Sequence, residues 1–295
     1  MSLGERGHLE PMHGVMPGRS MKTNDRLVDV PGSSTAPGFV IAILSFSLAG
    51  AQAASVSNAA EPNDPKATEQ WEPVPKLVTP GDIAGSPPSD AIVLFDGRDL
   101  DQWESCKDGS PARWKVHDGV MTVDKSAGNI QTKQLFRNYQ LHLEWRVPEG
   151  ITGEGQARGN SGLFLASTGR ANEGYEIQIL DSWKNKTYVN GQAASVYKQA
   201  PPLVNAMRAP GRWQTYDVVW TAPVFAPDGR LESSAYVTLF HNGVLVQNHR
   251  EFSGETTYIG KPRYKPFAAA AIKLQAHDDP SPPISFRNIW VRRLD

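Results

Sequence analysis

Cysteine is almost absent from this chain. Cys106 is the only one among 295 residues. A single thiol allows no intramolecular disulfide and no zinc site built from several cysteine ligands, and it weakens the case for a thiol nucleophile. We therefore expect Cys106 to be an ordinary packed side chain.

Clustered charge and metal-binding patterns are also missing. The 30 Lys and Arg residues are balanced by 31 Asp and Glu residues, and no long basic run occurs. Because binding to a phosphate backbone needs clustered Lys and Arg, the sequence predicts no nucleic-acid partner. The seven histidines lack the spacing of a zinc site, so no cofactor is indicated. The adjacent Asp278 and Asp279 are a weak signal for a calcium loop, and nothing in the sequence indicates an oligomeric state.

The one long apolar run is too short for a membrane helix. It covers residues 39–51 (FVIAILSFSLAGA), whereas a spanning helix needs about 20 apolar residues. Lys22 and Arg26 precede it, and Ala51-Gln52-Ala53 forms an A-x-A cleavage signature. We expect residues 1–53 to be a signal peptide with an extended N-terminal region, no stable membrane span after cleavage, and a periplasmic or secreted protein. A short anchoring helix is the competing interpretation, and a start at Met21 would give a leader of more ordinary length.

The next stretch, residues 54–90, lacks hydrophobic periodicity. It is rich in Ala, Pro, Asn, Asp and Ser and contains seven prolines, which disfavour regular structure. We interpret it as a linker.

From residue 91 onward, short segments of alternating apolar and polar residues recur between turn signals. No amphipathic helix of three turns is indicated. Asp118-Gly119 and Asn242-Gly243 are hairpin turn signals. The segments expected as strands are 92–95, 114–116, 120–123, 139–147, 162–166, 175–180, 216–221, 235–240, 244–247, 269–276 and 284–291. This pattern predicts a single all-β domain over residues 91–295, built as two packed antiparallel sheets.

Several motifs of this region, taken in order, resemble the 3-keto-disaccharide hydrolase family. They are LFDGRDL (94–100) with Trp103, DGV (118–120), the strand 141–146, GNSG (159–162), GYEIQILD (174–181), GRWQTY (211–216), HNGV (241–244), LQ (274–275) and FRNIW (286–290). The resemblance implies a concanavalin-like jelly-roll β-sandwich with a concave sugar-facing sheet and activity on sugars oxidised at C3. One departure stands out: the family continues Leu-Gln with Asp-His-Gly, whereas Gln275 is followed here by Ala276, His277 and Asp278.

A 3-keto sugar offers a route to bond cleavage that an ordinary glycoside lacks. The C3 carbonyl acidifies the proton on C2, so a general base can remove it, and the resulting enolate can expel the C1 substituent. Addition of water then completes a net hydrolysis. Such an enzyme needs a base, an acid near the leaving oxygen, and donors for the enolate oxygen.

The polar faces of three predicted strands, 139–147, 175–180 and 269–276, supply candidates for these roles. If these faces belong to the concave sheet, they converge on one site. Glu144 and Glu176 are the candidate bases and His277 is the candidate acid. The candidate substrate-binding residues are Arg146, Asn160, Gln178, Asp181, Trp183, Lys273 and Gln275, among which Arg146, Lys273 and the glutamines could stabilise the enolate. Polar alternation also describes any solvated sheet face, so each assignment competes with that simpler interpretation.

Two kinds of function thus remain open besides a purely structural module. One is an exported hydrolase, or hydratase and lyase, acting on a carbohydrate substrate of the 3-keto-glycoside class. The other is a non-catalytic, lectin-like carbohydrate-binding module, since fold does not fix function. An enzyme needs a convergent acid and base, whereas a binding module does not.

Overall fold

The computed structural model describes residues 65–295, so the predicted signal peptide and residues 54–64 of the predicted linker lie outside the described residues. A single 3-10 turn, η1 (Pro65–Thr68), belongs to a first unit, and Trp71–Asp295 form a separate compact unit. None of the helices within residues 65–295 is long and apolar enough to cross a membrane.

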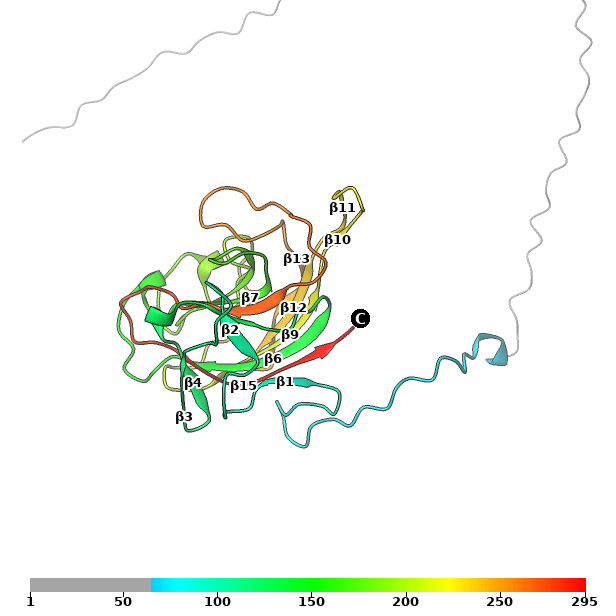
Figure 1. Ribbon diagram of the computed structural model, residues 1–295, viewed down its shortest axis with the longest axis horizontal. Helices are drawn as coiled ribbons and strands as arrows, with labels where there is room; N and C mark the ends of the chain where they lie inside the picture. Colours follow the sequence, from blue (N-terminus) through cyan, green and yellow to red (C-terminus); the bar gives the residue numbers. More distant parts are fainter. Residues whose placement is uncertain (1–64) are drawn as a thin grey trace, which may run out of the picture. The chain divides into compact units, whose positions relative to one another are not determined.

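The larger sheet of the compact unit has eight antiparallel strands. Figure 1 shows β12, β9, β6 and β15 lying side by side, with β1 next to β15. In spatial order the strands are β13 (Val244–Glu251), β12 (Tyr236–His241), β9 (Gln214–Thr221), β6 (Tyr139–Arg146), β15 (Ser285–Arg293), β4 (Val120–Thr122) and β3 (Lys115–His117), and β1 (Ile92–Phe95) also pairs with β15.

A smaller sheet of five antiparallel strands packs against it. Its order is β2 (Trp103–Ser105), β5 (Ile130–Thr132), β14 (Ala271–Leu274), β7 (Ser161–Ser167) and β8 (Gly174–Ile179). A separate two-stranded ribbon pairs β10 (Val224–Phe225) with β11 (Leu231–Ser233). Three short 3-10 turns complete the body: η2 (Lys125–Ala127), η3 (Gly155–Ala157) and η4 (Val189–Gly191).

The hydrophobic core lies between the two sheets. Alternate residues of β6 and β8 contribute buried side chains to it, as the sequence pattern predicted. Two tyrosines of the larger sheet also hydrogen-bond across the core: the hydroxyl of Tyr139 donates to the carbonyl of Leu165 at 2.6 Å, and that of Tyr216 donates to the carbonyl of Gln178 at 2.8 Å. The fold is therefore an all-β, concanavalin-like jelly-roll sandwich, which confirms the predicted fold class.

Most predicted strands are confirmed within a few residues of their observed ends. Both hairpin turns are also confirmed: Asp118 and Gly119 have φ of 50° and 75°, and Asn242 and Gly243 have φ of 54° and 79°, as a type I′ turn requires. The strands that were not predicted, β2, β5, β10 and β11, are only two or three residues long, too short to show an alternating pattern. Cys106 is buried, as expected for a packed thiol.

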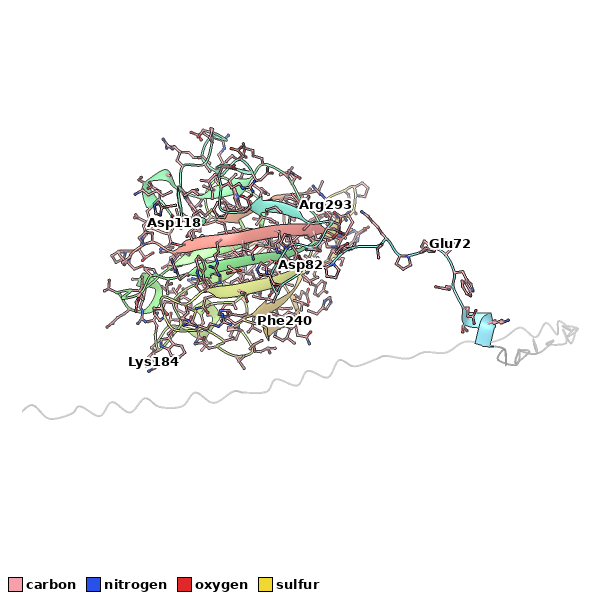
Figure 2. All side chains as sticks on the ribbon, turned by 90° about the horizontal axis from the view of Figure 1, so that it is seen from below. Glu72, Asp82, Asp118, Lys184, Phe240 and Arg293 are labelled. Atoms are coloured by element: carbon pink, nitrogen blue, oxygen red, sulfur yellow. The ribbon has the colours of Figure 1, made fainter. Side chains whose placement is uncertain are left out.

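The end of the predicted linker is bound to the outer face of the larger sheet. Figure 2, which looks onto that sheet, shows Asp82 in front of its strands. The carbonyl of Gly85 accepts hydrogen bonds from the indole of Trp290 at 2.8 Å and from the amide of Asn288 at 2.9 Å. The guanidinium of Arg292 pairs with Asp90 at 2.8 Å. Residues 85–90 therefore pack on the sandwich rather than serving only as a spacer.

Candidate active site

The outer face of the smaller sheet is the floor of a cavity of about 670 Å³. β8 contributes Glu176 and Gln178, and the segment after β14 contributes Gln275 and His277. Loops form the rest of the wall: Gln156 and Asn160 before β7, Tyr188, Tyr197 and Lys198 after β8, and Thr256 and Tyr258 after β13. Segments that are far apart in sequence therefore meet around one polar hollow.

Glu176 is the most unusual ionisable group of the cavity. Only 4% of the residue is exposed, and no donor within residues 65–295 hydrogen-bonds its carboxylate. Burial raises the pKa of Glu176 to about 8, and the positive charge of Lys273 offsets only part of that effect. A carboxyl group with such a pKa can gain and lose a proton near neutral pH, which is the property of a general acid or base.

Gly162 provides the space that the Glu176 carboxylate occupies. It lies on β7 directly opposite Gln178 of β8. A Cβ atom at position 162 would lie 2.4 Å from Oε1 of Glu176 and 3.0 Å from the ring of Phe164. A side chain at position 162 would therefore displace the Glu176 carboxylate from this place.

Three amide side chains hold one another in place beside Glu176. Gln178 donates through Nε2 to Oδ1 of Asn160 at 3.0 Å and, more weakly, to Oε1 of Gln156 at 3.5 Å. The side-chain amide of Asn160 donates to the main-chain carbonyl of Gln156 at 2.8 Å. Gln156 in turn donates to the carbonyl of Gly191 at 2.8 Å. By contrast, Oε1 of Gln275, a residue of the cavity lining, is buried without a hydrogen-bond partner among the described residues.

His277 lies on the rim with Asp279 behind it. Nδ1 of the imidazole is buried and 3.4 Å from Oδ2 of Asp279, which leaves Nε2 as the nitrogen available to a ligand. Burial disfavours the charge on Asp279, but interactions with His277, Ser281 and Lys125 outweigh it and lower the pKa of Asp279 to about 2. Asp279, considered above as a calcium ligand, accepts hydrogen bonds from Ser281 and forms an ion pair with Lys125 at 3.3 Å. Within the described chain, no group of three or more His, Cys, Asp or Glu side chains is placed to hold a metal ion.

Aromatic and cationic side chains from loops close the other wall. The hydroxyls of Tyr188 and Tyr197 are 2.8 Å apart. Lys198 donates to the carbonyl of Tyr258 at 2.7 Å, and its Nζ lies 3.9 Å from the centre of the Tyr258 ring. Among the described residues, Lys198 is the only lysine or arginine that lines the cavity. Sequence reasoning missed this wall because its residues lie in irregular loops without periodicity.

The expectation that Glu144 and Arg146 join this site is wrong. Both lie on β6 of the larger sheet, and their side chains are on its outer face because the alternate residues of β6 fill the core. Glu144 accepts hydrogen bonds from Arg287 at 2.7 Å and from Asn288 at 3.0 Å. Burial opposes the charge on Glu144, but hydrogen bonds from His142, Asn288 and Arg287 prevail and lower its pKa to about 2. Arg146 stacks on Trp213 at 4.5 Å.

Three further predicted ligands also lie outside the cavity lining. Lys273 shares the face of Glu176, but its fully buried ammonium group donates to the carbonyls of Gly169, Ala171 and Glu173, at 3.1, 2.8 and 2.9 Å. Asp181 is fully buried and pairs with Arg158 at 2.7 Å. Trp183 is 38% exposed and is not part of the lining.

Known proteins are similar to the part of this chain that forms the sandwich. A family model described as a 3-keto-alpha-glucoside-1,2-lyase-like domain matches residues 90–292. A curated relative, the 3-keto-disaccharide hydrolase of Bacteroides thetaiotaomicron, is 26% identical over an alignment of 151 residues, and the match covers 41% of this chain and 49% of that protein. The match therefore spans about half the length of this curated relative.

Solved structures from Parabacteroides distasonis are also similar. One protein, provisionally named a glycosyl hydrolase, is 54% identical with a TM-score of 0.73, and the match covers 78% of this chain and 97% of that one. A second protein with the same provisional name is 21% identical with a TM-score of 0.50, covering 69% and 99% of the two chains, and shares the fold.

Proposed function

Because the chain belongs to the family of 3-keto-alpha-glucoside-1,2-lyase-like domains, we propose that it cleaves 3-keto-glycosides at C1. The family match confirms the resemblance drawn from its motifs. The observation that supports this proposal most directly is Glu176, a buried carboxyl group with a pKa near 8 in the same cavity as a histidine. The reaction is an elimination followed by addition of water, with net hydrolysis of a 3-keto-disaccharide as its outcome.

Glu176 is the base in this proposal. Its ionised carboxylate takes the proton from C2, which the C3 carbonyl acidifies, and the electron pair of the C2–H bond forms the enolate. Because the carboxylate is desolvated and lacks a hydrogen-bond donor within the described chain, it is a stronger base than a carboxylate in water.

His277 is the acid that protonates the leaving oxygen as the C1–O bond breaks. Asp279 faces the buried Nδ1 at 3.4 Å, so the acid is the imidazolium, which carries a proton on both ring nitrogens and gives the one on Nε2 to the leaving oxygen. In the second stage water adds its oxygen to C1 and a proton returns to C2, which restores the ketone and yields the 3-keto sugar. Asp279 contacts the imidazole of His277 and not the substrate, so it acts as a positioning residue.

The negative charge of the enolate requires donors in the cavity. Lys198 provides the cation, and the carboxamide of Gln275 provides further polar contacts. The left-handed backbone of Lys198, with φ of 57°, is held by its N–H, which donates to the carbonyl of Asn190 at 2.8 Å. A donor that is fixed before the reaction needs little reorganisation as charge develops.

Turnover of a defined substrate tests this function. We expect the purified chain to release 3-keto-glucose from 3-keto-trehalose, measured by chromatography against a heat-denatured control. An elimination mechanism also predicts exchange of the C2 hydrogen with deuterated water in the product, detected by mass spectrometry. Measurable binding of 3-keto-trehalose without any turnover would instead favour the lectin-like module.

Substitution of Gly162 by alanine tests the position of Glu176. The strand conformation of Gly162 suits alanine, but the new Cβ displaces the Glu176 carboxylate, which it would approach to 2.4 Å. Since a displacement of about 1 Å can lower a rate by about 10²-fold, we expect kcat to fall by at least about tenfold. The midpoint of thermal unfolding should change little, because a side-chain terminus can move aside. An unchanged kcat would contradict the role of this carboxylate.

Export is part of the same proposal. The apolar run at 39–51 with its A-x-A signature supports cleavage near residue 53 and a periplasmic or secreted enzyme.

A further inference from the structure

Three tyrosine rings face the ammonium group of Lys198. Its Nζ lies 3.9 Å from the centre of the Tyr258 ring, 5.7 Å from that of Tyr188 and 5.9 Å from that of Tyr197. All three distances are within the range of about 6 Å over which a cation is attracted to an aromatic face. These three rings are the tyrosine cage of Lys198.

The charge of Lys198 is held by neutral groups. Lys198 forms no ion pair with an Asp or Glu among residues 65–295, unlike Lys125 and Lys265. It donates instead to the main-chain carbonyl of Tyr258 at 2.7 Å. An ammonium group has three N–H donors, so this contact leaves donors for a negative charge that develops in the cavity.

The two loops that meet at the tyrosine cage are also tied together at their bases. Lys198 follows η4, and Tyr258 lies in the connection that follows β13. The side chain of Gln199 accepts from the N–H of Ser253 at 2.7 Å and donates to the carbonyl of Gly254 at 3.1 Å. Lys198 and Tyr258 are therefore brought together by contacts beyond their own.

The segment that carries Tyr258 is anchored to the strand of the proposed base. The N–H of Glu255 donates to the carbonyl of Arg263 at 3.0 Å, which closes the base of this segment. The hydroxyl of Thr256 accepts from the main-chain N–H of Glu176 at 3.1 Å. Residues 255–258 thus connect the backbone of Glu176 with the ammonium group of Lys198.

Resting on the proposed function, we propose that Tyr258 is a positioning residue whose ring and main-chain carbonyl hold the ammonium group of Lys198 where the enolate charge develops. Residues 255–258 then fix the cation relative to the base, since Thr256 binds the backbone of Glu176 and Tyr258 binds Lys198. Tyr258 acts through Lys198 and not on the reacting atoms.

A double-mutant cycle tests whether Tyr258 acts through Lys198. Tyr258→Ala removes the ring, and we expect kcat for 3-keto-trehalose to fall by about tenfold, with a smaller change in KM. Lys198→Met removes the charge and should lower kcat by about 10²-fold. The double variant should be no slower than Lys198→Met alone. If Tyr258→Ala lowers kcat by the same factor in both backgrounds, or not at all in wild type, the positioning role is wrong.

Two further single variants serve as controls. Tyr258→Phe keeps the ring and should retain most of the wild-type kcat, whereas a loss as large as that of Tyr258→Ala would contradict the role of the ring. Ile259 is the next residue along, is 84% exposed and is not part of the cavity lining, so Ile259→Ala should leave kcat unchanged.

Acetylation of Lys198 by acetic anhydride reports on the tyrosine cage without any turnover. Lys198 is half-buried, and mass spectrometry of its peptide gives the rate of modification. We expect Tyr258→Ala to raise this rate several-fold and Ile259→Ala to leave it unchanged. Equal rates in wild type and Tyr258→Ala would contradict the tyrosine cage alone. If wild type does not cleave 3-keto-trehalose, the proposed function fails and the catalytic role of Tyr258 with it.

Discussion

Glu176→Gln is expected to lower kcat for 3-keto-trehalose by about 10³-fold, which is within the range that a general base contributes. The glutamine side chain has nearly the same shape as the glutamate but cannot take the C2 proton. Substrate binding should be retained, because the amide still presents polar atoms to the cavity. The measurement is steady-state kinetics, with exchange at C2 followed by mass spectrometry.

Glu144→Gln is the matched control for this variant. It makes the same chemical change on the outer face of the other sheet, away from the cavity lining. We expect it to keep most of the wild-type kcat. Full activity in both variants would rule out Glu176 as the base, and a comparable loss in both would show that the cavity alone does not define the site.

The same Glu176 variant should also change how stability depends on pH. The folded-state pKa of Glu176, about 8, is above its ordinary value of 4.5, so the folded protein binds this proton more tightly than the unfolded chain. Its contribution to stability is fully present below pH 4.5 and is lost as the pH rises from 4.5 to 8, by at most about 1.4 kcal/mol per pH unit.

Glu176→Gln removes this titration. The variant should therefore gain stability relative to wild type as the pH rises through that window, measured by urea denaturation at pH 5, 7 and 9. Other titrations, including that of His142, whose pKa is raised to about 9, cancel in the difference between the two proteins. Parallel stability curves over this range would show that the carboxyl group titrates normally.

Lys273→Met is expected to lower the free energy of unfolding by about 3–5 kcal/mol. The methionine can fill the space of the lysine stem but cannot donate to the carbonyls of Gly169, Ala171 and Glu173. The contact of the ammonium group with the ring of Phe164, at 4.7 Å, is lost as well. The loop between β7 and β8 would then lose its anchor, and burial alone would set the pKa of Glu176, which should rise further.

Urea denaturation measures the loss of stability. Lys115→Met, an exposed lysine on β3, is the control and should change stability by less than about 0.5 kcal/mol. The pKa of Glu176 in the Lys273 variant can be followed by NMR titration of the side-chain carboxyl carbon. A Lys273→Met protein as stable as the control would mean that water replaces the ammonium group without cost.

The alternating pattern of the sequence was sufficient to say which side chains of a strand face the core. It placed Tyr175, Ile177 and Ile179 toward the core and Glu176 and Gln178 on the other side, as the structure shows. It did so because side chains alternate between the two faces of any strand. The same rule oriented β6 correctly, with Leu141 and Leu143 inward and Glu144 outward.

Alternation cannot say which sheet a strand joins, so it grouped Glu144 with Glu176 although the two lie on different sheets. Glu144 and Glu176 have the same local pattern, but β6 pairs with β9 and β15, whereas β8 pairs with β7. The surroundings of two side chains on one face are decided in the same non-local way. Lys273 and Glu176 face the same side, yet carbonyls of the loop at 169–173 bind the lysine ammonium, whereas Glu176 lines the cavity.

The sequence by itself thus determined the class of fold, the residues facing outward on each strand, and the family, because periodicity, turns and ordered motifs are local properties. Only the tertiary structure decided that Glu176, Gln275 and His277 share a cavity without Glu144, and that Tyr188, Lys198 and Tyr258 complete it. The reason is physical: strand pairing across more than a hundred residues and the packing of irregular loops depend on the whole core, and no short segment encodes either.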